Sequence, residues 1–264
     1  MIAKAPGRIA LSTTSIRARD AASTAATLDN PAYQYYVLAV LSLSYVFNVI
    51  DRGVLSIVQQ DIREELQISR TAMGLLTSLG FGLFYAVMAV PIARLADRWS
   101  RVHVLALATS LWSAATALCG TAFNYASLAA FRTATGVGEA GGTPPSHSLI
   151  SDYFPISKRA TALAIYAMSV PIGTAIGSLV SGWSNVYFGW RQTFLIVGLP
   201  GVAVALLVWL TVKEPPRGYA DGPQSKPKLQ TPAFLEVCRF LLTRKSFVHM
   251  SVAAALHADR FPAQ

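Results

Sequence analysis

Charged residues are scarce in this sequence of 264 residues. Asp, Glu, Lys and Arg together make up 13%, whereas hydrophobic residues make up 53%. Soluble globular domains carry about 25% charged residues. The sequence therefore has too few charges to cover a surface that faces water, and its composition favours a membrane protein.

Cysteine is also scarce, and so are the sequence motifs that are typical of enzymes and metal sites. Cys119 and Cys238 lie far apart and outside any C-x-x-C pair, so zinc and redox motifs have no support. The patterns G-x-x-x-x-G-K-[ST], H-E-x-x-H and G-x-S-x-G do not occur. One G-x-G-x-x-G string, at 136–141, lies inside an apolar run rather than between a strand and a helix, as a dinucleotide site requires. We therefore expect a protein that is not an enzyme, with no catalytic residue, no metal and no cofactor.

The N-terminal region lacks the apolar core of a secretory signal peptide. Residues 1–32 are polar, and the first apolar run begins near Tyr33. We expect residues 1–32 to form a disordered cytoplasmic tail.

Six apolar runs follow, each of about the 20 residues that a helix needs to cross a bilayer. None alternates polar with apolar residues, and a helix satisfies its own backbone hydrogen bonds in lipid. The sequence predicts an all-α membrane protein, with a six-helix transmembrane domain over 33–212 built from two inverted three-helix repeats. The runs are Tyr33–Val58, Thr71–Ile92, Val102–Phe123, Ser127–Ile150, Ala160–Val186 and Gln192–Val212.

Basic residues collect in alternate loops. The net charge is +9, and 16 of the 22 basic residues lie in four segments: 1–32, 93–101, 151–159 and 213–246. Cytoplasmic loops of membrane proteins carry such an excess of Lys and Arg. We therefore expect a multi-pass protein of the cell (inner) membrane with its N-terminus in the cytoplasm. Because the basic residues do not interleave with aromatic ones, we expect no nucleic-acid partner.

The last part of the sequence differs from the rest. Residues 213–246 are rich in Pro and Gly and are interpreted as a cytoplasmic linker, with a short surface helix near 233–242. A seventh apolar run begins near Phe247 but continues for only about ten residues, which is too short to span a bilayer. We interpret 247–264 as the truncated start of a seventh helix.

Four ionisable residues lie within the apolar runs: Asp51 and Arg52 in the first, Arg132 and Glu139 in the fourth. A charge at membrane depth is costly unless it faces a partner or a polar cavity. Arg132 and Glu139 share one helix face, and Asp51 and Arg132 are expected at similar depth, where they could pair. Two interpretations remain open: a buried pair that only joins two helices, or a cavity whose carboxylate binds a proton and whose arginine binds an anion.

The turn after the second run concentrates charge in very few residues, namely Arg94, Asp97, Arg98 and Arg101. A solvated charge cluster is one interpretation. The other is a cytoplasmic gate, in which Asp97 caps a helix N-terminus and the arginines bind carboxylates or helix C-termini.

Small residues recur every four positions in three runs, an arrangement that lets membrane helices approach closely. Generic packing explains most of this pattern, and the alternative is that some stripes face a second six-helix half. The stripes are Gly74-Ser78-Gly82-Ala86, Ala130-Ala134-Gly138-Gly142 and Ser169-Gly173-Gly177-Ser181.

The charged turn resembles the signature G-x-L-x-D-R-x-G-R-[RK] of the major facilitator superfamily, although Ala93, Ser100 and Val102 depart from it. Further strings occur in order and resemble the spinster-like branch of that superfamily: Asn48–Arg52, Gly136–Ala140, Ser151–Pro155, Gly189–Arg191 and Glu214-Pro215. The resemblance covers about 33–218.

The resemblance implies a secondary transporter with twelve membrane spans. Proteins of this branch are often proton-coupled, and some carry lysolipid or sphingolipid-type anions. The resemblance also implies that Asp51, Arg52, Arg132 and Glu139 line the central cavity. We expect transport of an organic, anionic or amphipathic solute by alternating access, with protons, the bilayer and a second six-helix half as partners. The alternative is a truncated, non-transporting membrane protein that acts as an interaction partner or is an inactive fragment.

Overall fold

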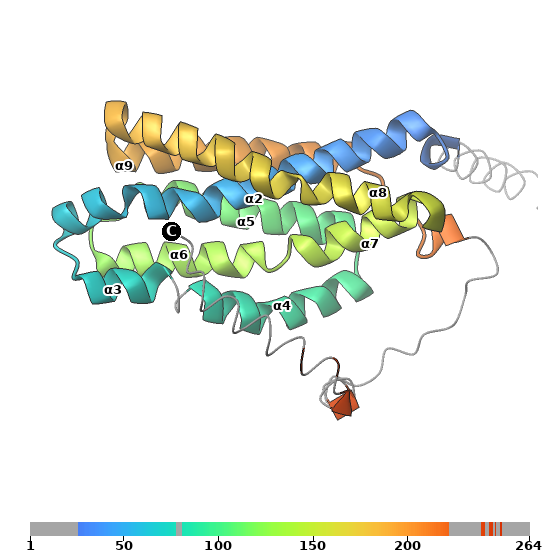
Figure 1. Cartoon of the computed structure of the whole chain (residues 1–264), viewed down its shortest axis with the longest axis horizontal. Coiled ribbons are helices and arrows are strands. Elements are labelled where there is room, and N and C mark those ends of the chain that lie inside the picture. Colours follow the sequence, from blue (N-terminus) through green and yellow to red (C-terminus); the bar gives the residue numbers. More distant parts are fainter. Residues whose placement is uncertain are drawn as a thin grey trace, which may run out of the picture. The chain divides into compact units, whose positions relative to one another are not determined.

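A computed structural model describes residues 26–77 and 81–221, together with 239–240, 243–244, 246 and 249. The chain divides into two compact units, Met1–Gln224 and Ser225–Gln264. The expected tail up to residue 25, most of the expected surface helix near 233–242 and almost all of 247–264 lie outside the described residues. Throughout the described ranges the regular structure is helical, which confirms the all-α prediction (Figure 1).

The first unit contains the following helices in chain order: α2 (Pro31–Leu66), α3 (Arg70–Leu75), α4 (Phe81–Arg98), α5 (Arg101–Cys119), α6 (Tyr125–Glu139), α7 (Thr143–Tyr153), α8 (Ile156–Ala167), α9 (Ser169–Thr211) and the 3-10 helix η2 (Tyr219–Asp221). The second apolar run corresponds to α3 and α4, and the fourth to α6 and α7, which are separated by a break at Ala140–Gly142.

Local sequence signals set the ends of these helices. The side chain of Asn30 accepts a hydrogen bond from the Ala32 amide, and Pro31 occupies the first turn of α2, where its missing amide hydrogen costs nothing. The helix ends at Gln67, which adopts a left-handed conformation (φ 53°). Residues Asn30 and Pro31, within the expected tail, therefore already belong to the start of the first helix.

α9 is two antiparallel helices that meet at Gly189, whose φ of 79° suits glycine. In the first part, Gly173 lies against Val46 and Gly177 against Ile50, so this part runs parallel to α2. In the second part, Gly198 lies against Ala117 and Gly201 against Ser113, so this part runs back along α5. The reversal accounts for the two separate apolar runs expected over this segment.

Three helical stretches among the described residues are long and apolar enough to cross a membrane: Pro31–Leu66, Arg101–Cys119 and Ile156–Thr211. The last contains the reversal at Gly189. Of the other two expected spans, one includes residues 78–80, which lie outside the described residues, and the other is divided by the turn at Ala140–Gly142.

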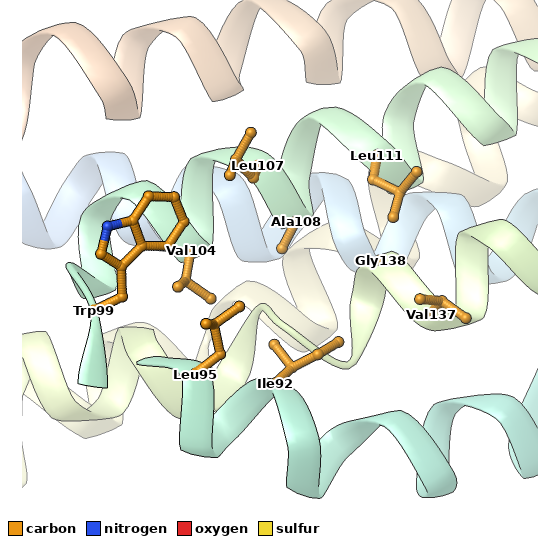
Figure 2. A pocket seen from close by; sticks show the side chains of 9 residues that line it. All are labelled: Ile92, Leu95, Trp99, Val104, Leu107, Ala108, Leu111, Val137 and Gly138. Carbon is orange, nitrogen blue, oxygen red and sulfur yellow. The ribbon is translucent and has the colours of Figure 1, made fainter. Parts of the chain in front are cut away.

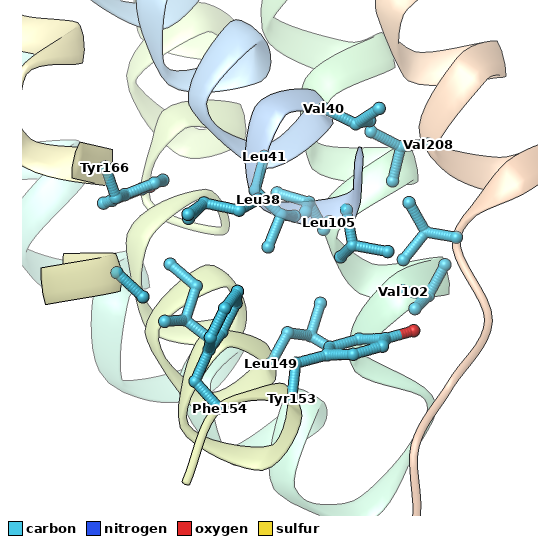
Figure 3. Close-up of a cluster of buried hydrophobic side chains, with 14 of the residues drawn as sticks. Leu38, Val40, Leu41, Val102, Leu105, Leu149, Tyr153, Phe154, Tyr166 and Val208 are labelled. Atoms are coloured by element: carbon cyan, nitrogen blue, oxygen red, sulfur yellow. The ribbon is translucent and has the colours of Figure 1, made fainter. Parts of the chain in front are cut away.

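Two apolar clusters hold the helices together. One joins α2, α5, α7, α8 and the end of α9, and includes Leu41, Leu105 and Tyr153 (Figure 3). The other joins α2, α3, the start of α6 and the second part of α9, and includes Val54, Leu128 and Phe194. Along α2, and along α6 followed by α7, one apolar cluster ends where the other begins. Polar side chains lie at this boundary between the two clusters.

The stripe of small residues Ser169–Ser181 packs against α2 of the same bundle. A Cβ atom at Gly173 would lie 2.9 Å from the carbonyl oxygen of Val46, and the Ser169 hydroxyl donates to the carbonyl of Ser42. The hypothesis that this stripe faces a second half is therefore wrong. A Cβ atom at Gly74 or Gly82, on the stripe of the second run, would have no described residue within 4 Å, so these two glycines show no close packing of the kind seen at Gly173.

Candidate functional site

Polar side chains gather between the two apolar clusters. The structure brings together all four ionisable residues of the apolar runs. Asp51 is fully buried, Arg132 is 3% exposed and Glu139 is 1% exposed. Asn48, one helical turn before Asp51 and Arg52, is buried beside them.

The ion pair of this cluster joins Arg52 to Glu139. The Nε atom of Arg52 donates to Oε2 of Glu139. The Glu139 side chain is completely buried, whereas the Arg52 side chain is 39% exposed. The guanidinium of Arg52 also lies over two aromatic rings of α4, 5.7 Å from the Phe81 centroid and 5.0 Å from that of Tyr85. Arg52 therefore connects a buried carboxylate to the open side of the cluster.

Arg132 contacts Asp51 through the main chain. Its NH1 group donates to the Asp51 carbonyl oxygen at 3.4 Å, and its guanidinium lies 5.5 Å from the Phe81 ring centroid. The side-chain pairing of Asp51 with Arg132, left open by the sequence, is not formed. Both carboxylate oxygens of Asp51 are buried without a hydrogen-bond partner among the described residues, as is Oε1 of Glu139.

Two glycines allow α6 to carry Arg132 and Glu139 into this position. A Cβ atom at Gly138 would lie 2.7 Å from the main-chain nitrogen of Trp112 on α5, and one at Gly136 would lie 3.1 Å from the carbonyl oxygen of Phe81 on α4. α6 thus approaches both neighbours closely, and it ends at Glu139. The cluster therefore has two carboxylates and two guanidinium groups in a mostly buried space.

A second charged cluster surrounds Arg101, which is 1% exposed. Its guanidinium pairs with Asp152 at the end of α7 and, at 2.7 Å, with Glu214 after α9. It also donates to the Pro215 carbonyl at 2.8 Å. Glu214 in turn accepts from the Val102 amide in the first turn of α5. Arg101 therefore joins three separate segments at one end of the bundle.

The other residues of the expected gate are more exposed. Asp97 pairs with Arg217 at 3.6 Å, and Arg217 donates to the carbonyl of Ala96. Asp97 lies in the last turn of α4 and does not cap α5, whose N-cap is Ser100, so a capping role of Asp97 in a gate stays a prediction. Arg94 and Arg98 are exposed on α4.

The partners of Arg101 were not identified as site residues from the sequence. Asp152 and Glu214 belong to two of the strings that carry the family resemblance, and this is the signal that could have identified them. Tyr153 strengthens the same junction by donating to the Lys213 carbonyl. Burial, and then its neighbour Tyr33, raise the pKa of Tyr153, so the phenol stays protonated as a donor.

Comparisons with known proteins identify the family of this chain. The family model of the Major Facilitator Superfamily matches residues 41–258. An MFS-type efflux pump of Mycolicibacterium smegmatis is 34% identical over 182 residues. The sphingosine-1-phosphate transporter SPNS2 of Danio rerio is 28% identical over 219 residues. A crystal structure of a bacterial homologue of the human lysosomal transporter Spinster, inward-facing and unoccupied, has 38% identity and a TM-score of 0.75.

The chain spans about half or less of the length of these relatives. It covers 42% of the efflux pump, 43% of the sphingosine-1-phosphate transporter and 52% of the solved chain. The matches include 69%, 82% and 86% of the present chain, respectively.

Proposed function

Because this chain belongs to the Major Facilitator Superfamily and resembles its spinster-like branch, we propose that it supplies one helical bundle of a secondary active transporter. The proposed solute is organic and anionic or amphipathic. The observation that carries the proposal is the cluster of Asp51, Arg52, Arg132 and Glu139 between two apolar clusters, in which every residue except Arg52 is buried. Ionisable residues at membrane depth mark solute and proton pathways.

Proton coupling is proposed for the two carboxylates. Asp51 has no hydrogen-bond partner for its carboxylate among the described residues, and a buried carboxylate in that state is costly when charged. A proton removes this cost, and Asp51 is therefore the first candidate for the coupling site. Glu139 is the second, because its negative charge is compensated by Arg52 only while their ion pair is intact.

Solute binding is proposed for the two arginines. Arg52 is partly exposed and could exchange Glu139 for the anionic group of a solute. A proton on Glu139 would make this exchange easier, because it would release the guanidinium. Two ligands that favour the same rearrangement are coupled thermodynamically, as symport requires. The name of one relative, a sphingosine-1-phosphate transporter, agrees with an amphipathic anion.

We place the Arg101 cluster at the cytoplasmic side, in accordance with the distribution of basic residues. There it would hold the segment after α9 against α5 and α7 during alternating access. The N-terminus would lie in the cytoplasm and the protein in the cell (inner) membrane. The face of this turn that carries Asp97, two residues from Trp99 and therefore on the other side of α4, would meet a second helical bundle of the complete transporter.

The test is transport by the complete transporter in proteoliposomes. Labelled lysophospholipid and a labelled hydrophilic organic acid would each be offered with and without a pH gradient. We expect accumulation of one of them that requires the gradient and stops with a protonophore. Solute accumulation that does not depend on the pH gradient would exclude proton coupling. No transport of either solute would contradict the proposed solute class.

A further inference from the structure

The outer surface of α5 carries two apolar grooves that share a wall. The first lies between α5, α4 and α6, has a volume of about 200 Å³ and is drawn in Figure 2. There, Ile92 and Leu95 of α4 face Leu107 and Leu111 of α5. The second lies between α5 and the second part of α9, has a volume of about 400 Å³ and includes Ser110, Leu206 and Trp209. We call them the α4–α5 groove and the α5–α9 groove.

Trp99 and Leu107 line both grooves and form the ridge between them. Leu107 is 58% exposed, and Leu206 and Trp209 in the α5–α9 groove are 49% and 54% exposed. Both grooves extend along α5 in the same direction. The α4–α5 groove extends from Val104 to Leu111, and the α5–α9 groove extends from His103 to Ser110. Seven residues of helix correspond to about 10 Å. The two apolar grooves are therefore parallel, and they begin at the same end of α5.

The common end of the grooves is aromatic and basic. The rings of Trp99 and His103 stack with centroids 5.7 Å apart. Arg98, directly before Trp99, is exposed and forms no ion pair with any described residue. The two nearby acidic groups are already compensated, because Asp97 pairs with Arg217 and Glu214 with Arg101.

This combination identifies the occupant by its chemistry. Tryptophan is enriched where membrane meets water, and basic residues near the surface attract anionic lipids. A polypeptide partner would have to fill both grooves with apolar side chains and also supply an acidic side chain at Arg98, whereas one anionic phospholipid supplies two acyl chains and a phosphate in a single molecule. We propose that one anionic phospholipid straddles the Leu107 ridge, with an acyl chain in each groove and its phosphate near Arg98 and His103. This lipid site lies on the outer face of the bundle and does not depend on the identity of the transported solute.

Quenching of tryptophan fluorescence by brominated phospholipids tests the proposal. The chain would be reconstituted in phosphatidylcholine vesicles that contain equal fractions of either brominated phosphatidylglycerol or brominated phosphatidylcholine. Trp209→Phe is compared with Trp183→Phe, because Trp183 is similarly exposed (56%) but lies on the first part of α9, away from both grooves. We expect stronger quenching by the anionic lipid. Trp209→Phe should lower this excess to the part that comes from Trp99, whereas Trp183→Phe should leave it unchanged.

Two further variants separate shape from charge. Ser110→Phe fills the α5–α9 groove and should abolish the excess quenching. Arg98→Gln should lower the preference for the anionic lipid about fivefold, which corresponds to about 1 kcal/mol for one basic group near the membrane surface.

Three results would overturn the proposal. Equal quenching by both lipids would mean ordinary lipid contact without a site. If Trp209→Phe and Trp183→Phe lose the excess quenching equally, the preference for anionic lipid arises elsewhere on the protein. Quenching of Trp209 by neither lipid, restored when the protein is diluted in the bilayer, would show that a second copy of the chain covers this face.

Discussion

Arg52 on α2 and Glu139 on α6 form an ion pair although 87 residues separate them in the sequence. The carboxylate is fully buried and the guanidinium is 39% exposed, so the pair connects the interior of the bundle with its open side. An ion pair with one buried and one exposed partner is suited to break when a solute anion or a proton binds.

Removal of the Glu139 charge should stop transport. In the complete transporter, Glu139→Gln keeps the shape of the side chain but cannot hold Arg52 as a carboxylate does. We expect pH-driven uptake to fall at least about tenfold, equivalent to about 1.4 kcal/mol, and the same for Arg132→Ala. The matched control is Glu64→Gln, the same chemical change on an exposed part of α2. Normal uptake by both Glu139→Gln and Arg132→Ala would assign these residues a purely structural role.

Asp51→Asn should separate exchange from uphill transport. Asparagine cannot bind and release a proton, whereas the nearby arginines remain available for the solute. We expect solute counterflow at near normal rates and no accumulation driven by a pH gradient. Both would be measured on the same proteoliposomes. Retained uphill uptake would exclude Asp51 as the coupling group.

Arg101→Ala should strongly destabilise the chain. The substitution leaves Asp152 and Glu214 without their shared cation, and breaking a buried ion pair costs about 3–5 kcal/mol. Arg98→Ala, at an exposed position three residues earlier, should cost less than about 0.5 kcal/mol. Thermal unfolding of the purified chain in detergent would compare them. Similar unfolding temperatures for the two variants would show that the Arg101 cluster does not stabilise the fold.

Gly138→Ala and Gly182→Ala should have opposite effects. At Gly138 the new methyl group would lie 2.7 Å from the main-chain nitrogen of Trp112, and we expect a loss of about 1–3 kcal/mol because α5 and α6 must separate. At Gly182 no described residue lies within 4 Å of the new methyl group, and alanine should stabilise α9 by up to about 1 kcal/mol. Denaturant unfolding in detergent measures both. A neutral Gly138→Ala would contradict the close contact of these helices.

Cysteine labelling should show the segment after α9 on the cytoplasmic side. Pro216→Cys and Thr121→Cys place exposed thiols at positions that the basic asymmetry assigns to opposite sides. Cys119 is buried, and Cys238 would be replaced by serine. We expect a membrane-impermeant reagent to label intact cells at Thr121→Cys only. The reverse pattern would invert the proposed topology.

The sequence by itself determined the class of protein and the family. Its low charge and long apolar runs leave helices in a membrane as the structure that satisfies the backbone. It also identified the four ionisable residues of the cluster, because a charge inside an apolar run is conspicuous in any such sequence.

Only the tertiary structure decided which of these charges meet. Helical periodicity places Arg132 and Glu139 on one face of α6, but it says nothing of how α6 is rotated or shifted against α2. That relative position depends on close contacts between helices, such as Gly138 against the main chain of Trp112, between residues far apart in sequence. The ion pair therefore joins Arg52 to Glu139, the carboxylate of Asp51 has no hydrogen-bond partner among the described residues, and Arg101 binds two carboxylates from distant segments.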